Sequence, residues 1–188
     1  THKNFLYNYS PRSIEKLSKL LNQSLPNNPV SNEILSLIEI LKKEVHSRFY
    51  VIDYLKKGII YIHGKLPDLI KEYLEKKFSE IPGIRFIIAN SVILEGMNLP
   101  IDSLYIMYTY SLGGKELTNL IGRVNRLNRI FTPQGNYLEK LIPPIHFINS
   151  EEFNGKGSKM LNKIRLLRGR IFDDTIKNPT LDQFDFDK

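Results

Sequence analysis

The sequence predicts an α/β fold in which a mostly parallel sheet is covered by helices on both faces. Apolar runs of strand length alternate with segments of helical periodicity along most of the chain. The strand-like runs are apolar at consecutive positions, which is typical of parallel strands buried on both faces. In such sheets ligands bind beyond the carboxyl ends of the strands. We therefore expect the loops after Asn8, Ile62, Asn90 and Tyr110 to form the functional edge.

Residues that favour the starts and ends of helices and strands give approximate bounds for these elements. Ser10 can cap a helix that has Pro11 at its first position, and Pro67 can start another. Strands are expected at residues 5–9, 58–64, 85–90, 103–110 and 144–149. Helices are expected around residues 11–21, 34–45, 67–78 and 115–127.

Composition limits the classes of protein and of partner. A chain of 188 residues with 41% hydrophobic residues can bury the core of one domain, expected at residues 1–150 and followed by an extension at 151–188. A net charge of +7 favours polyanionic partners. The chain contains no cysteine, which excludes disulfides and thiolate metal sites.

The sequence gives no sign of a membrane segment. No apolar stretch approaches the roughly 20 residues that cross a bilayer, and the first residues lack the apolar core of a signal peptide. We therefore expect an intracellular, cytoplasmic protein that does not bind a membrane. Because the chain starts at Thr1 and enters a predicted strand within a few residues, we also expect it to be a piece of a longer protein.

A polar cluster follows the third predicted strand, within residues 88–100. Asn90 and Ser91 stand at the end of the strand, where backbone can approach a ligand. Gly96 permits a positive φ or a close contact, and Asn98 offers both a donor and an acceptor. Taken alone, this segment is also compatible with a plain turn between strands.

Two arginines lie on the helix predicted at residues 115–127. Arg123 and Arg126 are three residues apart and so share a helical face, and Gly122 would let that face approach another surface. Guanidinium groups suit phosphate because each offers a planar fork of donors and stays charged. The alternative is a solvated basic helix, which Arg129 would extend.

Together these two segments resemble motifs of superfamily-two helicases, in particular the Ski-type and DEAD/DEAH-like branch. The fifth motif of that family commonly reads ATSTLAEGVNLP, which aligns without gaps with Ala89–Pro100. The sixth commonly reads QMIGRAGR, which aligns with Asn119–Arg126.

Two earlier segments resemble the same family and occur in the expected order. NFLYNYSPRSIEKLSKLL is similar to the fourth motif, a strand that runs into a Ser-containing loop and a helix. GIIYIHGKLP is similar to the family segment GVAYHHAGLP and retains His63, Gly64, Leu66 and Pro67. The resemblance therefore covers about residues 3–150 and points to the C-terminal RecA-like domain of such a helicase.

The resemblance implies a RecA-like three-layer sandwich that works with an N-terminal RecA-like domain of the same polypeptide. That partner domain would hold most of the ATP and Mg²⁺, and the pair would bind DNA or RNA. Arg123 and Arg126 would act as arginine fingers that stabilise charge on the transferring phosphoryl group. Nucleotide contacts would come from Gly96, Asn98, Asn119 and Gly122. Nucleic-acid contacts would come from Ser10, Arg12, His63, Gly64, Asn90 and Ser91.

Three asparagines depart from the family pattern. Asn119 replaces Gln or His and Asn90 replaces Thr, and an amide can still form hydrogen bonds at both positions. Asn125 replaces the Gly between the two arginines, where a side chain either narrows the nucleotide cleft or marks a divergent branch.

The phosphate-binding loop GxxxxGK[ST] is absent from the sequence. Gly114-Lys115 comes nearest to it, but Thr109 stands at the position of the first Gly and Glu116 replaces the Ser or Thr. We therefore expect this chain alone neither to hydrolyse ATP nor to unwind a duplex.

The C-terminal extension contains a basic segment and then an acidic tail. If it is helical, Lys159, Lys163 and Arg170 form a stripe beside an apolar face. The apolar face should dock on a domain, and the stripe either contacts phosphates or is solvated. The four histidines are scattered along the chain, so no metal site is expected.

Two further functions fit the same motifs. One is a non-catalytic RecA-like binding module, which Asn125 would favour. The other is a translocase that moves on duplex DNA without separating its strands. An intact GxxxxGK[ST] and an acidic motif upstream of Thr1 would favour a motor over a binding module.

Overall fold

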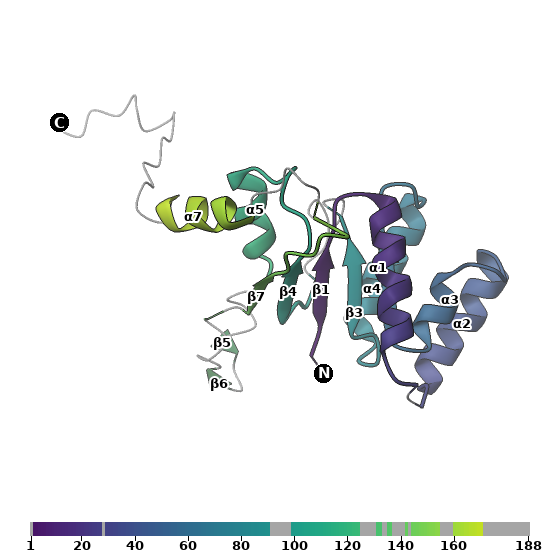
Figure 1. Ribbon diagram of the computed structural model, residues 1–188. Coiled ribbons are helices and arrows are strands. Elements are labelled where there is room, and N and C mark those ends of the chain that lie inside the picture. The colour runs from purple at the N-terminus through teal and green to yellow at the C-terminus, as the bar shows by residue number, and fades with distance from the viewer. Residues whose placement is uncertain are drawn as a thin grey trace, which may run out of the picture.

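Five parallel strands form the central sheet of the protein. The computed structural model describes residues 2–27, 29–90, 99–124, 131–132, 135–136, 142, 144–154 and 160–170. The strands are β1 (Asn4–Tyr7), β2 (Ile59–Ile62), β3 (Phe86–Ala89), β4 (Ser103–Ile106) and β7 (Ile145–Phe147). They lie in the order β2-β3-β1-β4-β7, and every neighbouring pair is parallel (Figure 1). The parallel sheet expected from the sequence is thus confirmed.

Helices cover the sheet. They are α1 (Pro11–Ser24), α2 (Asn32–Glu44), α3 (Val51–Leu55), α4 (Asp68–Glu80), α5 (Gly114–Ile121) and α7 (Met160–Arg170). Helices α1, α3 and α4 pack against β2, while α7 packs against α5 at the other end of the sheet (Figure 1). All four residues of β1 and of β2 are buried. Because successive residues of a strand point to opposite faces, both faces of these strands are covered.

The start of α1 follows the sequence closely. The Ser10 side chain accepts a hydrogen bond from the Ser13 backbone N–H, and Pro11 occupies the first turn, where its missing N–H costs nothing. Ile14 is fully buried, as expected for the apolar face of this helix. Leu20, expected on the same face, is 37% exposed, so the buried stripe is narrower than the sequence indicated.

Two strands are shorter than expected. β1 ends at Tyr7 instead of Tyr9, and β4 ends at Ile106 instead of Tyr110. Their residues beyond these points are aromatic and polar, and they form the loops of the sheet edge. Apolar and aromatic side chains favour a strand locally, but the chain must leave the sheet to reach the next helix.

Two small elements were missed by the sequence analysis. The five residues of α3 are too few to show a helical period. The antiparallel pair β5 (Phe131–Thr132) and β6 (Gly135–Asn136) has only two residues in each strand. Within the ranges described above, no helix is long and apolar enough to span a bilayer.

A buried lysine ties the start of β1 to the end of α4. The Lys3 ammonium donates hydrogen bonds to the carbonyls of Phe78, Ile81 and Ile84 at 2.6, 2.7 and 2.6 Å. It also lies 4.7 Å from the centre of the Phe78 ring. A buried ammonium is tolerated only when its N–H groups donate hydrogen bonds, and here the acceptors are carbonyls at and just after the C-terminus of a helix.

The Lys3→Met variant should lower the free energy of unfolding by about 3 kcal/mol, because the carbonyls at the end of α4 lose a charged donor. Urea denaturation of the chain measures this change. Lys19→Met, at an exposed position on α1, is the matched control and should stay within about 0.5 kcal/mol of the native chain. Equal midpoints for the two variants would show that the Lys3 contacts contribute nothing.

Candidate functional site

The carboxyl ends of β1, β3 and β4 meet at one edge of the sheet. Tyr7 lies opposite Ala89 on one side and Ile106 on the other. The pairing continues one step further, since the Asn8 N–H donates to the Ala89 carbonyl and the Met107 N–H to the Tyr7 carbonyl, both at 3.0 Å. The loops after these strands therefore begin side by side, as expected from the sequence, while the function of this edge stays a prediction.

Two tyrosines that the sequence analysis overlooked lie at this edge. The rings of Tyr9 and Tyr108 stack with centroids 5.5 Å apart and an interplanar angle of 20°. The Asn90 side-chain amide lies beside them and donates to the Tyr9 carbonyl at 3.5 Å. The predicted strands at residues 5–9 and 103–110 include both tyrosines, whereas the structure places them in the loops after β1 and β4.

Asn8 is a buried polar side chain at the same edge. Its Oδ1 accepts the Tyr9 N–H at 2.8 Å, which turns the chain out of β1. Its Nδ2 is buried and has no hydrogen-bond partner among the described residues. A buried amide of this kind is costly in a merely structural loop.

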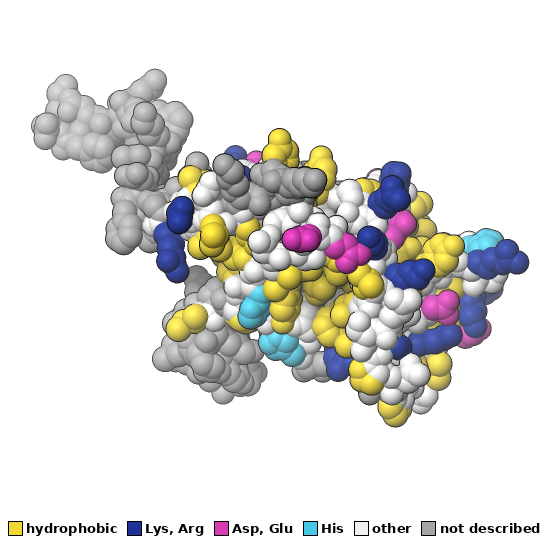
Figure 2. All heavy atoms as spheres, viewed as in Figure 1, with side chains coloured by type: hydrophobic (Ala, Val, Ile, Leu, Met, Phe, Trp, Pro, Cys, Tyr) yellow, Lys and Arg dark blue, Asp and Glu magenta, His cyan; other side chains and the backbone are white. Residues whose placement is uncertain are grey.

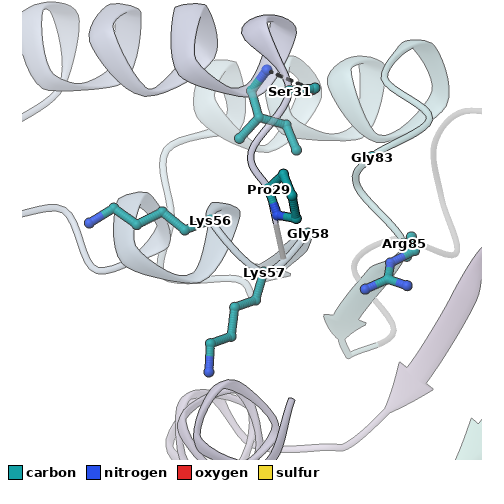
Figure 3. Close-up of a pocket in the computed structure, with 8 residues that line it drawn as sticks. Pro29, Ser31, Lys56, Lys57, Gly58, Gly83 and Arg85 are labelled. Atoms are coloured by element: carbon teal, nitrogen blue, oxygen red, sulfur yellow. Dashed lines mark hydrogen bonds between the residues drawn. The ribbon is translucent and has the colours of Figure 1, made fainter. Parts of the chain in front are cut away.

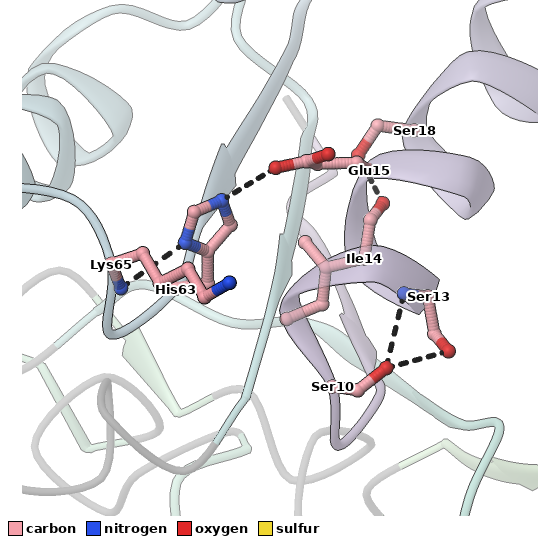
Figure 4. A network of polar contacts seen from close by, with 7 residues as sticks. All are labelled: Ser10, Ser13, Ile14, Glu15, Ser18, His63 and Lys65. Atoms are coloured by element: carbon pink, nitrogen blue, oxygen red, sulfur yellow. Dashed lines mark hydrogen bonds and ion pairs between the residues drawn. The ribbon is translucent and has the colours of Figure 1, made fainter.

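The start of α1 presents one cation to solvent. The Ser10 hydroxyl accepts the Ser13 N–H at 3.1 Å and donates to the Ser13 hydroxyl at 2.8 Å (Figure 4). Both of these contacts stay within the helix cap. Arg12, in the first turn of α1, is exposed. Of the two candidate nucleic-acid contacts in this loop, Arg12 is thus the one directed to the surface.

His63 lies inside the fold. Its ring stacks on Tyr61 with centroids 5.6 Å apart. Its Nδ1 accepts the Lys65 N–H at 3.3 Å, as Figure 4 shows. Its hydrogen is therefore on Nε2, which donates to the Glu15 carboxylate at 3.2 Å. The neighbouring Gly64 is exposed. The His63 side chain thus holds the loop after β2 against α1, and the backbone at Gly64 forms the surface.

A contact next to the two predicted nucleotide-binding segments lies at a different place. Ile101 and Val124 form an isolated parallel β-bridge. Ile101 follows the segment 89–100 in sequence, and Val124 follows Arg123. Because Ile101 precedes β4, the bridge lies toward the amino end of that strand and away from the carboxyl edge.

Arg123 does not lie on a helix, contrary to the expectation from the sequence. Helix α5 ends at Ile121, and the Gly122 N–H closes its last turn by donating to the Thr118 carbonyl at 2.9 Å. Gly122 therefore ends the helix, for which glycine is well suited. The half-buried Arg123 follows in a turn, so the prediction that it lies on this helix is wrong, while Arg126 lies outside the described residues.

The remaining predicted nucleotide contacts are divided between described and undescribed segments. Asn119 is exposed on α5, and Gly122 is exposed at its end. The predicted contacts outside the described residues are Ser91, Gly96, Asn98 and Arg126, together with the divergent Asn125.

A buried carboxyl on α4 lies within electrostatic reach of Arg123. Burial raises the pKa of Glu75 above its ordinary value, and the nearby Glu72 raises it further. Lys71 and Arg123 act in the opposite direction.

The amino edge of β2 and β3 contains a pocket of about 330 Å³ (Figure 3). Its turn needs glycine at position 58, where φ is +71° and a Cβ atom would lie 2.3 Å from the Gly83 carbonyl oxygen. Lys57 points away and donates to the Leu25 carbonyl at 2.6 Å, and Lys56 pairs with Asp53 at 3.1 Å. Two of the cations near this pocket are thus engaged elsewhere.

Positive charge is not gathered into one patch on the face that Figure 2 shows. Lys and Arg side chains are spread over it with acidic side chains among them. In the described part of the chain, no group of three His, Asp or Glu side chains could hold a metal ion. The net charge of +7 is therefore a general property of the chain and locates no site on this face.

Helix α7 is held by one of the lysines of the predicted basic stripe. The Lys163 ammonium donates to the Leu112 carbonyl at 2.5 Å, in the loop that leads from β4 to α5. Met160 is buried, in agreement with an apolar face that docks. Lys163 thus anchors the helix, while the domain boundary at residue 150 stays a prediction.

Comparison with known proteins supports the fold described above and identifies no family for the chain. No protein-family model matches the chain, and no curated protein sequence does. The C-terminal domain of the DEAD-box protein Dbp5 is similar at 14% identity over 92% of this chain and 86% of that one, with a TM-score of 0.43. The C-terminal part of the Fun30 ATPase domain is similar at 12% identity over 88% of this chain, with a TM-score of 0.50.

The TM-score for Dbp5 is below 0.5, so of these two structures we use the Fun30 structure to support the fold. The chain spans 39% of that structure. At 12% identity the similarity concerns the fold alone. Together with the all-parallel sheet, it confirms the prediction of a RecA-like α/β sandwich.

Tyr7, beneath the stacked tyrosines, should make the fold sensitive to alkaline pH. Burial raises the pKa of Tyr7 to about 12, although a hydrogen bond with Ser111 acts in the opposite direction. The folded chain therefore favours the neutral phenol. Stability from this group is complete below the ordinary pKa of 10.0 and is lost as the pH rises from there toward 12.

The free energy of unfolding should fall between about pH 9 and about pH 11, and this fall should be about 1.4 kcal/mol smaller in the Tyr7→Phe variant than in the native chain. Denaturant unfolding at the two pH values measures this difference. Tyr50→Phe, at a tyrosine that is 72% exposed, should behave like the native chain. If Tyr7→Phe loses as much stability as the native chain, Tyr7 does not titrate with a raised pKa.

Proposed function

We propose that this chain is the second RecA-like motor domain of an ATP-dependent nucleic-acid helicase or translocase. Its fold class and the order of its four motif-like segments support this function. The similar Fun30 structure is described as part of an ATPase domain. The N-terminal RecA-like domain of the same polypeptide would hold most of the ATP and its Mg²⁺.

The bridge between Ile101 and Val124 is the observation on which the proposal rests. The fold brings Ile101 and Val124 together although they are 23 positions apart in the chain. In the resembling family both motif segments contact the nucleotide, and in this chain the bridged residues adjoin the segment 89–100 and Arg123. A guanidinium at such a position can stabilise the charge that develops on a phosphoryl group supplied from a facing domain.

The carboxyl edge is the proposed nucleic-acid surface. Arg12 offers an exposed cation, Gly64 offers exposed backbone, and Asn90 offers an amide. These groups suit phosphate and sugar, and contacts of this type position a strand without reading its sequence. The edge and the bridge are separate, so a strand and a nucleotide could bind at the same time.

The Arg123→Ala variant of the full-length protein should hydrolyse ATP about 10³-fold more slowly, because the transition state loses a positive charge. Its affinity for nucleic acid should change by less than about twofold, since Arg123 lies away from the carboxyl edge. Steady-state ATPase assays and fluorescence anisotropy measure the two quantities. The 188-residue chain alone should show no ATPase activity.

Arg48→Ala is the matched control, because Arg48 is exposed between α2 and α3 and should leave turnover unchanged. Unchanged turnover in Arg123→Ala would reject the finger role. A full-length protein that binds nucleic acid but lacks ATPase activity would instead be a non-catalytic binding module. ATP hydrolysis stimulated by duplex DNA without strand displacement would identify a duplex translocase.

A further inference from the structure

The stacked tyrosines lie just beyond the paired ends of two neighbouring strands. Tyr7 pairs with Ile106 across β1 and β4. Tyr9 and Tyr108 each lie two residues beyond this pair, in the loops that begin where β1 and β4 end. Parallel strands lie about 4.8 Å apart, which places two aromatic rings at stacking distance. The observed centroid separation of 5.5 Å fits this geometry.

One ring of the pair is open to solvent. Tyr9 is 51% exposed, whereas Tyr108 beneath it is half-buried. The Tyr9 N–H donates a hydrogen bond to Asn8 Oδ1 at 2.8 Å, which fixes the backbone that presents the ring. The Asn90 amide lies against the Tyr9 carbonyl. The exposed ring is therefore held in place before any ligand arrives, which reduces the entropy lost on binding.

The surroundings favour a polyanion that contains flat rings. Arg12 stands three residues after Tyr9 and is exposed, and the first turn of α1 contains no acidic residue. Phosphate beside Arg12 and a ring on Tyr9 would use the two kinds of group that this edge offers. Nucleobases stack on tyrosine whatever their identity, because every base has a π-face.

We propose that Tyr9, supported by Tyr108, is a stacking platform for an unpaired base of a single nucleic-acid strand. This inference rests on the proposed function, to which it adds a contact that recognises the base as well as the backbone. It also makes a chemical distinction that can be tested. A platform of this kind should prefer a strand with bases over an equally charged strand without them.

The experiment compares an oligothymidylate of about ten nucleotides with an abasic oligonucleotide of equal length. Affinities are measured by fluorescence anisotropy on the purified chain. Tyr9→Ala should weaken binding of oligothymidylate about tenfold and leave binding of the abasic strand unchanged. Tyr9→Phe keeps the ring and should stay within about twofold of the native chain. Tyr50→Ala, at an exposed tyrosine between α2 and α3, should have no effect.

A second readout uses the absence of tryptophan from the sequence. The Tyr9→Trp variant has a single indole, whose fluorescence should be quenched by oligothymidylate and not by the abasic strand. Equal quenching by ATP alone would assign the ring to a free nucleotide and overturn the proposal. So would an equal loss of affinity for both strands in Tyr9→Ala, or no loss for either.

The outcomes separate this inference from the proposed function. If the native chain binds both strands and Tyr9→Ala binds each strand as tightly as the native chain does, the platform is rejected while the proposed nucleic-acid surface is retained. If the native chain binds neither strand, the platform and the proposed nucleic-acid surface are both rejected. Folding of each variant is checked by its unfolding midpoint in urea.

Discussion

Strand β1 lies between β3 and β4, and the parallel register of these three strands determines where the loops of the protein start. Tyr7 is opposite Ala89 and Ile106, and all three residues end their strands. A shift by one residue would exchange the two faces of β1 and move Tyr9 away from Tyr108. At the other end of β1, the ammonium of Lys3 holds the strand to α4. The middle strand is thus fixed at both ends.

This constraint separates two sets of functional candidates. The loops at the carboxyl edge hold exposed Arg12 and Tyr9, together with Asn90. The chain then passes to the amino end of β4, where the bridge from Ile101 to Val124 places Arg123. A motor domain needs such a separation, because its nucleotide must be hydrolysed while a strand stays bound. The fold therefore accommodates both proposed contacts without competition between them.

The sequence predicted the sheet well because its signals were strong and local. Consecutive apolar residues identified β2 and β3, and Ser10 with Pro11 marked the start of α1. Prediction failed where tertiary structure overrides local preference. Tyr9 and Tyr108 look like strand residues because aromatic side chains favour strands, yet the turns that lead to α1 and α5 take them out of the sheet. The end of α5 was placed too late because Gly122 was interpreted as a packing residue.

The candidate site was predicted in part, through the resemblance of its motifs. That resemblance selected Arg123 and the segment 89–100, but no sequence pattern shows that Ile101 and Val124 touch. The burial of His63 was also beyond the sequence, since its contacts with Glu15 and Tyr61 come from two different elements. The stacking of Tyr9 on Tyr108 was likewise beyond the sequence, because both residues lie in loops after the strands end.

The central claim is that the carboxyl edge of the sheet is the nucleic-acid surface. Chemical-shift perturbation of backbone amides in the ¹⁵N-labelled chain, titrated with oligothymidylate, tests it most directly. Our account predicts that the largest shifts concentrate at Tyr9, Arg12, Gly64 and Asn90. Shifts that concentrate instead around Ser31, Lys56 and Arg85, at the amino-edge pocket, would contradict it.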